Sequence, residues 1–223
     1  YFGDRPVAIV DVPDVRRYPI DIVHLDEQPF PKAMSWIRIV LQKSRNSGEI
    51  DKAICKATAA LALRVYNKEL ESDGSVLCFL PGMEEIRQVD TLLKKRHSGR
   101  GDLVVRYLHS SVSSSDQAKV FLPGRKIILS TNLAETSVTI PDVKVVIDSG
   151  RERQFSLLDS TSDATTVVGS QLVTVNVSQA SAKQRAGRAG RVSAGTCYRL
   201  YTQQDHEAFT EYTKPEILRM DLS

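Results

Sequence analysis

Short apolar runs alternate along the chain with longer stretches in which apolar residues are more widely spaced. Uninterrupted runs are typical of strands buried on both faces of a sheet, whereas apolar residues at every third or fourth position indicate a helix. The runs predict strands at 7–10, 20–25, 76–80, 103–108, 126–129, 143–147 and 195–201. The wider spacing predicts helices at 31–42, 49–70, 83–95, 113–121 and 203–209, and a short helix from Asn132. This alternation predicts an α/β domain with a mainly parallel sheet covered on both faces.

The stretch 151–177 interrupts the alternation. Its two ends are rich in strand-forming residues, and the polar segment 159–163 lies between them. We therefore expect a β-hairpin that protrudes from the α/β body.

Composition narrows the class of protein only modestly. With 223 residues, 41% hydrophobic and 26% charged, the chain is long enough for one α/β domain, and no apolar run is long enough to span a bilayer. The net charge of +3 is too small to establish nucleic-acid binding. Cys55, Cys78 and Cys197 are widely separated, so we expect reduced, buried thiols in an intracellular protein and no metal site.

The strongest chemical signal is the segment 184–191, which reads QRAGRAGR. Its arginines, Arg185, Arg188 and Arg191, recur at three-residue spacing, which predicts that they lie near one face at the start of a helix capped by Ser181. Glycines between them cost helix stability but allow close approach of a backbone or ligand. The pattern favours phosphate binding over the alternative of a solvated basic helix face. In a parallel sheet, ligands bind at the carboxyl ends of the strands, where we expect most candidate residues.

This segment resembles motif VI of DEAH/RHA-type superfamily 2 helicases. Segments that resemble other motifs of this family follow its order: FLPG at 79–82 with Glu85 and Ile86, LHS at 108–110, STNLAETSVTI at 130–140, VIDSG at 146–150, CYRLY at 197–201 and PEILR at 215–219. The resemblance implies a RecA-like three-layer sandwich, the second motor lobe of an ATP-dependent RNA helicase. It also implies that residues 1–30 link this lobe to the first one, that 31–213 form the lobe, and that 214–223 begin a winged-helix domain.

The resemblance implies a role for each matching residue in ATP hydrolysis. Arg188 and Arg191 would be arginine fingers, Gln184 would orient the attacking water, and Ser137 would sense the γ-phosphate. Phe121 would stack on the adenine, with Thr139 and Asp142 near the ribose. Taken alone, Phe121 is more typical of a hydrophobic core.

On the RNA side, the resemblance implies sequence-independent contacts to the sugar-phosphate backbone from Thr131, Asn132, Ser110 and the turn at Gly82. Thr131 could instead cap the helix from Asn132. The hairpin would lie where strands part or brace the RNA exit. Asp148 is expected to end a strand and hold a loop, and Asp26 with Glu27 to lie in a loop. The expected partners are RNA, the first RecA lobe and the winged-helix domains of the same chain, and no membrane.

The sequence contains neither a GxxxxGK[ST] loop nor a DEAH segment. The resemblance assigns both to the first lobe, which would hold ATP-bound Mg²⁺, so we expect these 223 residues alone to be inactive. One alternative is a catalytically inactive lobe that serves as an RNA- or protein-docking module, and another is a DNA-directed helicase. We expect a cytoplasmic or nuclear location, with organelle targeting open.

Overall fold

The computed structural model describes residues 18–27, 30–47, 49–70, 73–98, 101–136, 138–157 and 170–215. The strand expected at 7–10, Ser137 and the start of a winged-helix domain beyond Pro215 lie outside these ranges.

A six-stranded sheet forms the centre of the fold, and every recorded pairing within it is parallel. Its strands are, in spatial order, β1 (Ile20–His24), β8 (Gly195–Arg199), β5 (Val143–Asp148), β2 (Ser75–Phe79), β4 (Lys126–Ser130) and β3 (Val105–Leu108). The mainly parallel sheet expected from the apolar runs is therefore confirmed.

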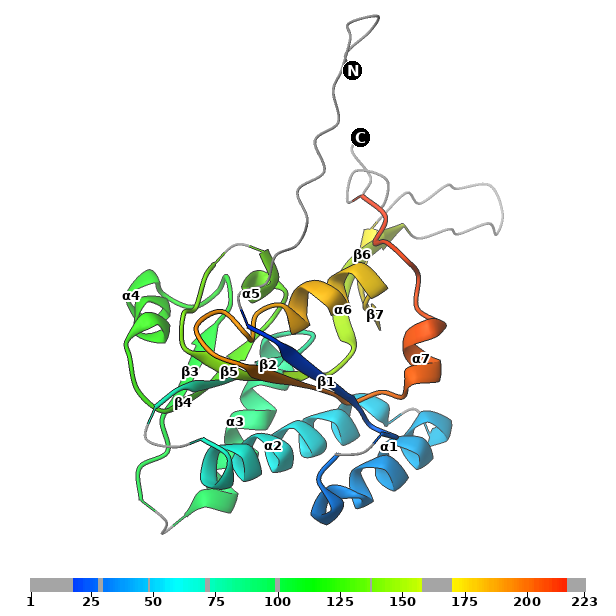
Figure 1. Cartoon of the computed structure of the whole chain (residues 1–223). Helices are drawn as coiled ribbons and strands as arrows, with labels where there is room; N and C mark the ends of the chain where they lie inside the picture. Colours follow the sequence, from blue (N-terminus) through cyan, green and yellow to red (C-terminus); the bar gives the residue numbers. More distant parts are fainter. Residues whose placement is uncertain are drawn as a thin grey trace, which may run out of the picture.

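Helices cover both faces of the sheet and complete a three-layer sandwich (Figure 1). One face carries α1 (Trp36–Ser47), α2 (Ile50–Lys68) and α3 (Met83–His97), and the other carries α5 (Leu133–Thr136) and α6 (Gln179–Ala186). The remaining helical elements are η1 (Lys32–Met34), α4 (Ser114–Ala118), η2 (Lys119–Phe121) and α7 (Gln203–Glu207).

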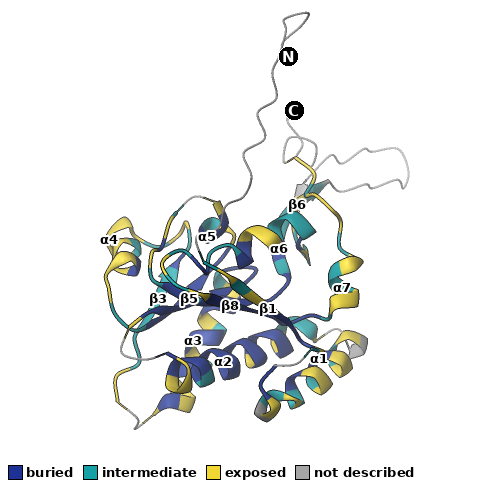
Figure 2. Ribbon diagram, in the orientation of Figure 1, coloured by how far each residue is buried: buried dark blue, intermediate teal, exposed yellow. Residues whose placement is uncertain are grey.

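The central strand β2 shows how one apolar run serves two cores. Side chains alternate across a strand, so Val76 and Cys78 pack into the cluster beneath α1, α2 and α3, whereas Leu77 and Phe79 pack into the cluster beneath α5 and α6. All five residues of β2 are buried, as in Figure 2, where the strands form the dark centre of the molecule. Burial on both faces explains the uninterrupted apolar sequence.

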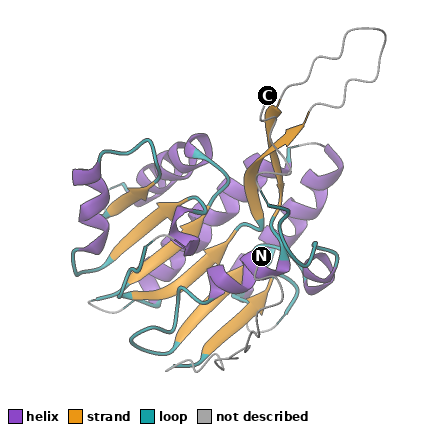
Figure 3. Ribbon diagram, turned by 90° about the horizontal axis from the view of Figure 1, so that it is seen from above, coloured by secondary structure: helices purple, strands orange, loops and turns teal. Residues whose placement is uncertain are grey.

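The expected hairpin is present. Strands β6 (Arg151–Leu157) and β7 (Ser170–Asn176) pair antiparallel, with Arg151 opposite Asn176. The N–H of Val177 donates to the carbonyl of Gly150 (3.0 Å), which closes the base of the hairpin. The two strands project from the α/β body (Figure 3), and they lie beside α6 (Figure 1).

Two helix predictions differ from the structure in detail. The helix expected at 31–42 is a 3₁₀ turn at Lys32–Met34 followed by α1, which continues to Ser47. The cap of α6 is Ser178 and not Ser181, since the Ser178 hydroxyl accepts the N–H of Ser181 (3.1 Å). The Ser113 hydroxyl caps α4 by accepting the N–H of Asp116.

Candidate functional site

The candidate residues lie at two opposite edges of the sheet. In a parallel sheet, residues that precede a strand lie at its amino edge and residues that follow one lie at its carboxyl edge. The carboxyl edge carries Gly82, Ser110, Thr131 and Asn132, and the amino edge carries Phe121, Thr139, Asp142, Arg188 and Arg191. The expectation that most candidates gather at the carboxyl ends is therefore wrong.

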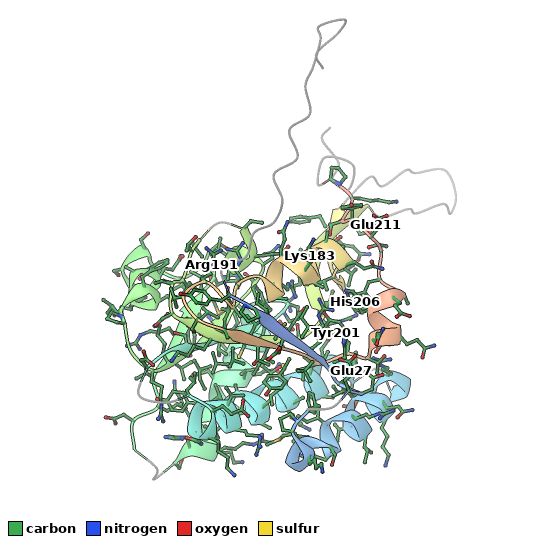
Figure 4. All side chains as sticks on the ribbon, viewed as in Figure 1. Glu27, Lys183, Arg191, Tyr201, His206 and Glu211 are labelled. Carbon is green, nitrogen blue, oxygen red and sulfur yellow. The ribbon has the colours of Figure 1, made fainter. Side chains whose placement is uncertain are left out.

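The path of the chain after β5 explains this placement. The hairpin leaves and rejoins the body at the carboxyl edge, and α6 then runs back to the amino edge, where β8 begins. The residues between α6 and β8, 187–194, form what we call the arginine loop. Figure 4 shows its Arg191 near the start of β1, whereas Glu27 lies beyond the end of that strand.

Gly190 seats the arginine loop against the start of β1. Its φ of +72° is in the left-handed region that favours glycine. A Cβ atom there would lie 2.6 Å from the side chain of Ile20 and 3.2 Å from the carbonyl of Tyr18. This glycine thus serves close approach of the backbone, one of the two uses expected from the sequence.

The arginine loop packs on the segment 131–142, which we call the connecting segment because it runs from the carboxyl end of β4 to the amino end of β5. Nη1 of Arg188 donates to the carbonyl of Val138 (3.0 Å), and Nη1 of Arg191 donates to Oγ1 of Thr139 (3.2 Å). One short segment therefore carries candidates at both edges.

Arg188 and Arg191 have unused hydrogen-bonding capacity. Their Nε atoms are buried without a hydrogen-bond partner in the described part of the chain, and no described carboxylate forms an ion pair with either residue. Burial, and next the positive charge of Arg191, lower the pKa of Arg188. Two neighbouring guanidinium groups with unused donors and no counter-ion suit an anion such as a phosphate group.

Gln184 belongs to the same surface. It is exposed in the last turn of α6, and together with Arg188 and Arg191 it lines an open groove of about 1310 Å³ beside β1. The structure thus brings together three of the four residues expected to act in hydrolysis. The fourth, Ser137, lies outside the described residues.

Phe121 and Asp142 occupy the amino edge in different ways. Phe121 is the last residue of η2 and is 41% exposed, so the alternative of a core residue is wrong. Oδ2 of Asp142 forms an ion pair with Nζ of Lys126 (2.5 Å), while Oδ1 of Asp142 is buried without a described partner. Stacking on adenine and contact with ribose stay predictions.

At the carboxyl edge, Asn132 and Ser110 are exposed, whereas Thr131 is buried. Gly82 precedes α3, and a Cβ atom there would lie 2.5 Å from Nη1 of Arg153 in the hairpin. Arg153 in turn pairs with Glu85 on α3 (2.9 Å). The absence of a side chain at Gly82 therefore leaves room for an ion pair that holds the hairpin against the body.

Arg185 differs from the other two arginines of its segment. It is fully buried, and its guanidinium pairs with Glu135 (3.1 Å), Asp148 (3.0 Å) and Glu152 (3.5 Å) and lies over the ring of Phe79. The expectation that all three arginines share one face at a helix start is wrong, because α6 ends at Ala186. Burial by itself would lower the pKa of Arg185, but the three carboxylates, Asp148 first, raise it.

The cluster around Arg185 was not found from the sequence as a group, although two of its members carried a signal. Asp148 ends β5 and accepts the N–H of Gly150 (2.9 Å), which confirms its expected role, and it also accepts the hydroxyl of Tyr201 (2.8 Å). Glu135 is the one charged residue of α5, where it follows Leu133 and Ala134. Glu152 gave no signal, because its position relative to Arg185 depends on how the hairpin packs.

The three cysteines are free and buried, as expected. Burial raises the pKa of Cys55 and of Cys197 to about 12, so neither thiol is prepared to act as a nucleophile. In the described residues, no group of three or more histidine, cysteine, aspartate or glutamate side chains is arranged to hold a metal ion.

Comparison with known proteins identifies the family. The model of the helicase conserved C-terminal domain matches residues 55–193, more than half of the chain. The chain belongs to this helicase family. The matched region contains the connecting segment, the hairpin and residues 187–193 of the arginine loop.

Named relatives place this helicase domain in the DEAH branch. The chain is 47% identical to ATP-dependent RNA helicase dhx29 of Xenopus laevis over 156 residues, which is 67% of this chain and 11% of that protein. It is 37% identical to human probable ATP-dependent RNA helicase DHX34 over 227 residues, which covers the whole chain and 18% of that protein. The chain thus spans between a tenth and a fifth of the length of these relatives.

A solved structure confirms the RecA-like fold. The crystal structure of the E. coli DExH-box NTPase HrpB superposes with a TM-score of 0.69 at 32% sequence identity, over 93% of this chain and 22% of that one. None of the described helices of the present domain is both long enough and apolar enough to cross a membrane.

Proposed function

We propose that the chain is the second motor lobe of an ATP-dependent RNA helicase, in which the amino edge of the sheet completes an ATP site and the carboxyl edge contacts the RNA backbone. The observation that carries this proposal is the pair Arg188 and Arg191. They lie without counter-ions in the described structure, with unused donors, on a surface shared with Gln184.

The arginine pair fits the phosphate groups of ATP. Two guanidinium groups can donate several charge-assisted hydrogen bonds to phosphate oxygens, and both residues line an open groove. Bound ATP would supply the transferred γ-phosphoryl group, on which negative charge must be stabilised during hydrolysis. In this proposal Arg188 and Arg191 stabilise that charge, and the amide of Gln184 orients the attacking water as both donor and acceptor.

Mg²⁺ would be held outside this lobe. The described residues offer no carboxylate cluster for a divalent cation, and the sequence has no phosphate-binding GxxxxGK[ST] loop. The proposal therefore assigns the metal and the phosphate cradle to the first lobe, and hydrolysis requires both lobes.

The two-edge arrangement supports coupling between ATP and RNA. Asn132 lies near the start of the connecting segment, at the edge proposed to contact RNA. Thr139, near its end, accepts a hydrogen bond from Arg191 at the edge proposed to contact ATP. Exposed amide and hydroxyl groups contact a nucleic-acid backbone without reading its sequence, which suits a translocating motor.

Arg191→Ala in the full-length protein tests the proposal. We expect RNA-stimulated ATP hydrolysis to fall by about 10³-fold or more, because an arginine finger stabilises transition-state charge. RNA affinity should stay within about twofold, since Arg191 lies at the opposite edge from Asn132. The measurements are steady-state ATPase activity with saturating RNA and fluorescence anisotropy of labelled RNA.

Lys183→Ala is a matched control, because Lys183 is an exposed cation that lines the same groove and is given no part in hydrolysis. Undiminished turnover in Arg191→Ala would exclude the finger assignment. Wild-type protein that binds RNA without hydrolysing ATP would instead support the alternative of an inactive docking lobe. Unwinding of RNA and DNA duplexes with the same overhang distinguishes an RNA from a DNA helicase.

A further inference from the structure

Arg185 connects the two edges of the sheet through a chain of short contacts. At the carboxyl edge, the carbonyl of Asn132 accepts the N–H of Glu135 (2.8 Å). The carboxylate of Glu135 accepts Nε of Arg185 (3.1 Å), and the carbonyl of Arg185 accepts the N–H of Arg188 (3.1 Å). Three hydrogen bonds therefore separate a residue proposed to contact RNA from a residue proposed to contact ATP.

The hairpin also contacts Arg185. Its Glu152 approaches Nη2 of Arg185 (3.5 Å), and the carbonyl of the adjacent Arg151 accepts Nη1 (3.2 Å). Glu152 is buried, and its other carboxylate oxygen also accepts a hydrogen bond from Gln154. The guanidinium group of Arg185 thus bonds to the hairpin, to α5 and to β5, while its backbone carbonyl accepts the N–H of Arg188 in the arginine loop.

The four contacts of the guanidinium are unequal. The carboxylates of Glu135 and Asp148, which belong to the α/β body, lie 3.1 and 3.0 Å from the guanidinium nitrogens. The contact with Glu152 is the longest, at 3.5 Å, and comes from the hairpin, which projects away from the body. Loss of the Glu152 charge would leave two carboxylates to hold Arg185. The arginine loop would keep its place, and only its connection to the hairpin would weaken.

We propose that Arg185 is a positioning residue that couples the hairpin to the arginine loop, and that Glu152 transmits the state of the hairpin to it. This inference rests on the function proposed above and adds that RNA at the carboxyl edge also contacts the hairpin. When RNA contacts the hairpin, the Glu152–Arg185 ion pair fixes the last turn of α6, and with it the backbone from which Arg188 extends. Arg185 itself touches neither ATP nor RNA.

Glu152→Gln in the full-length protein tests the coupling, since glutamine keeps the size and one acceptor oxygen of the side chain but removes the charge. We expect the ratio of RNA-stimulated to basal ATPase turnover to fall about threefold to thirtyfold, the range found for residues that couple two sites. The basal turnover and the RNA concentration for half-maximal stimulation should stay within about twofold of wild type.

Asp51→Asn is the matched control. Asp51 pairs with Arg151, the neighbour of Glu152 on β6, at 3.4 Å and thus fastens the same strand to α2 by a contact of similar length. It does not contact Arg185, so its loss should leave the stimulation ratio at the wild-type value. Glu135→Gln weakens the path from the other edge and should lower the ratio in the same way as Glu152→Gln.

Three results would overturn the coupling role. The first is an unchanged stimulation ratio in Glu152→Gln, and the second is an equal fall in basal and stimulated turnover, which indicates a structural role only. The third is the same loss in Asp51→Asn, which indicates simple anchoring of the hairpin. If wild-type protein hydrolyses ATP without RNA stimulation or not at all, the proposed function and this inference both fail. If RNA stimulates the wild type, any of the three results above contradicts the inference alone.

Discussion

Arg185 and the pair Arg188 and Arg191 belong to one eight-residue segment, yet their surroundings are opposite. Arg185 is fully buried among three carboxylates, whereas Arg188 and Arg191 have no ion pair with any described carboxylate. The end of α6 between them produces the difference, because Arg185 still follows the inner face of the helix and the other two extend from the loop. Equal spacing in sequence therefore does not imply equal function.

The difference also separates two physical roles. A guanidinium surrounded by carboxylates is already paired, and its removal leaves those carboxylates buried without a counter-ion, whereas a guanidinium with free donors can bind a ligand anion. The same substitution should therefore mainly reduce stability at Arg185, and mainly reduce anion binding at Arg188 or Arg191.

The largest expected effect is that of Arg185→Met on stability. Removal of the guanidinium leaves three carboxylates buried without a counter-ion, which costs about 3–5 kcal/mol of unfolding free energy. In a domain of this size, the midpoint of thermal unfolding should fall by roughly 6–20 °C. Arg188→Met should change the midpoint by less than about 2 °C, because it removes no ion pair. Similar midpoints for the two variants in a calorimetric scan would contradict the comparison.

A smaller effect is expected from an added anion. Inorganic phosphate at ten times its dissociation constant should stabilise the wild-type domain by about 1.4 kcal/mol if it binds only the folded state. Arg188→Met and Arg191→Met should remove most of this gain, while Lys183→Met should keep it. Thermal midpoints measured across a phosphate titration at constant ionic strength provide the test. An equal gain in all four proteins would show that the arginine pair is not an anion site.

The smallest expected effect concerns a third kind of arginine site, the pair of Arg45 and Asp205 that joins α1 to α7 (2.7 Å). Burial would raise the pKa of Asp205, but hydrogen bonds from Arg45 and Thr202 outweigh it and lower this pKa to about 2. A carboxyl group whose pKa is lowered in the folded state stabilises the protein at pH values above its unfolded pKa near 4. This stabilisation is lost as the pH falls toward 2. Because the pair is partly solvated, we expect about 1 kcal/mol or less.

Asp205→Asn should therefore be less stable than wild type at pH 6, and the two proteins should converge between about pH 4 and pH 2. Urea unfolding at several pH values measures the difference. A gap that persists unchanged at pH 2 would show that Asp205 acts mainly through its cap on α7 and not through its charge.

The sequence predicts most of this fold because local pattern and burial agree. The strand at 143–147 is an unbroken apolar run and becomes β5, and the pattern at 49–70 becomes α2 with only its ends shifted. The hairpin at 151–177 was recognisable because its ends favour strands and its middle is polar. The beginning of α1 was misplaced, since a 3₁₀ turn and an α-helix share the same early spacing.

The site was less predictable, because its geometry depends on where the chain travels between elements. Spacing alone could not show that α6 ends at Ala186, nor that the hairpin returns the chain to the carboxyl edge before α6 crosses the sheet. Those two features move Arg188 and Arg191 to the amino edge and leave Arg185 inside. The contact of Glu152 with Arg185 joins positions 33 residues apart and has no counterpart in a local pattern.

The order of the sheet has a practical consequence for anyone who shortens this protein. The region that matches the family model, 55–193, excludes both β1 and β8, although β8 lies beside β5 in the sheet. A fragment trimmed to that region would turn β5, an almost completely buried apolar strand, into an open edge. Open apolar edges pair with other chains, so such a fragment should aggregate when expressed, whereas one that includes 18–215 keeps this strand covered.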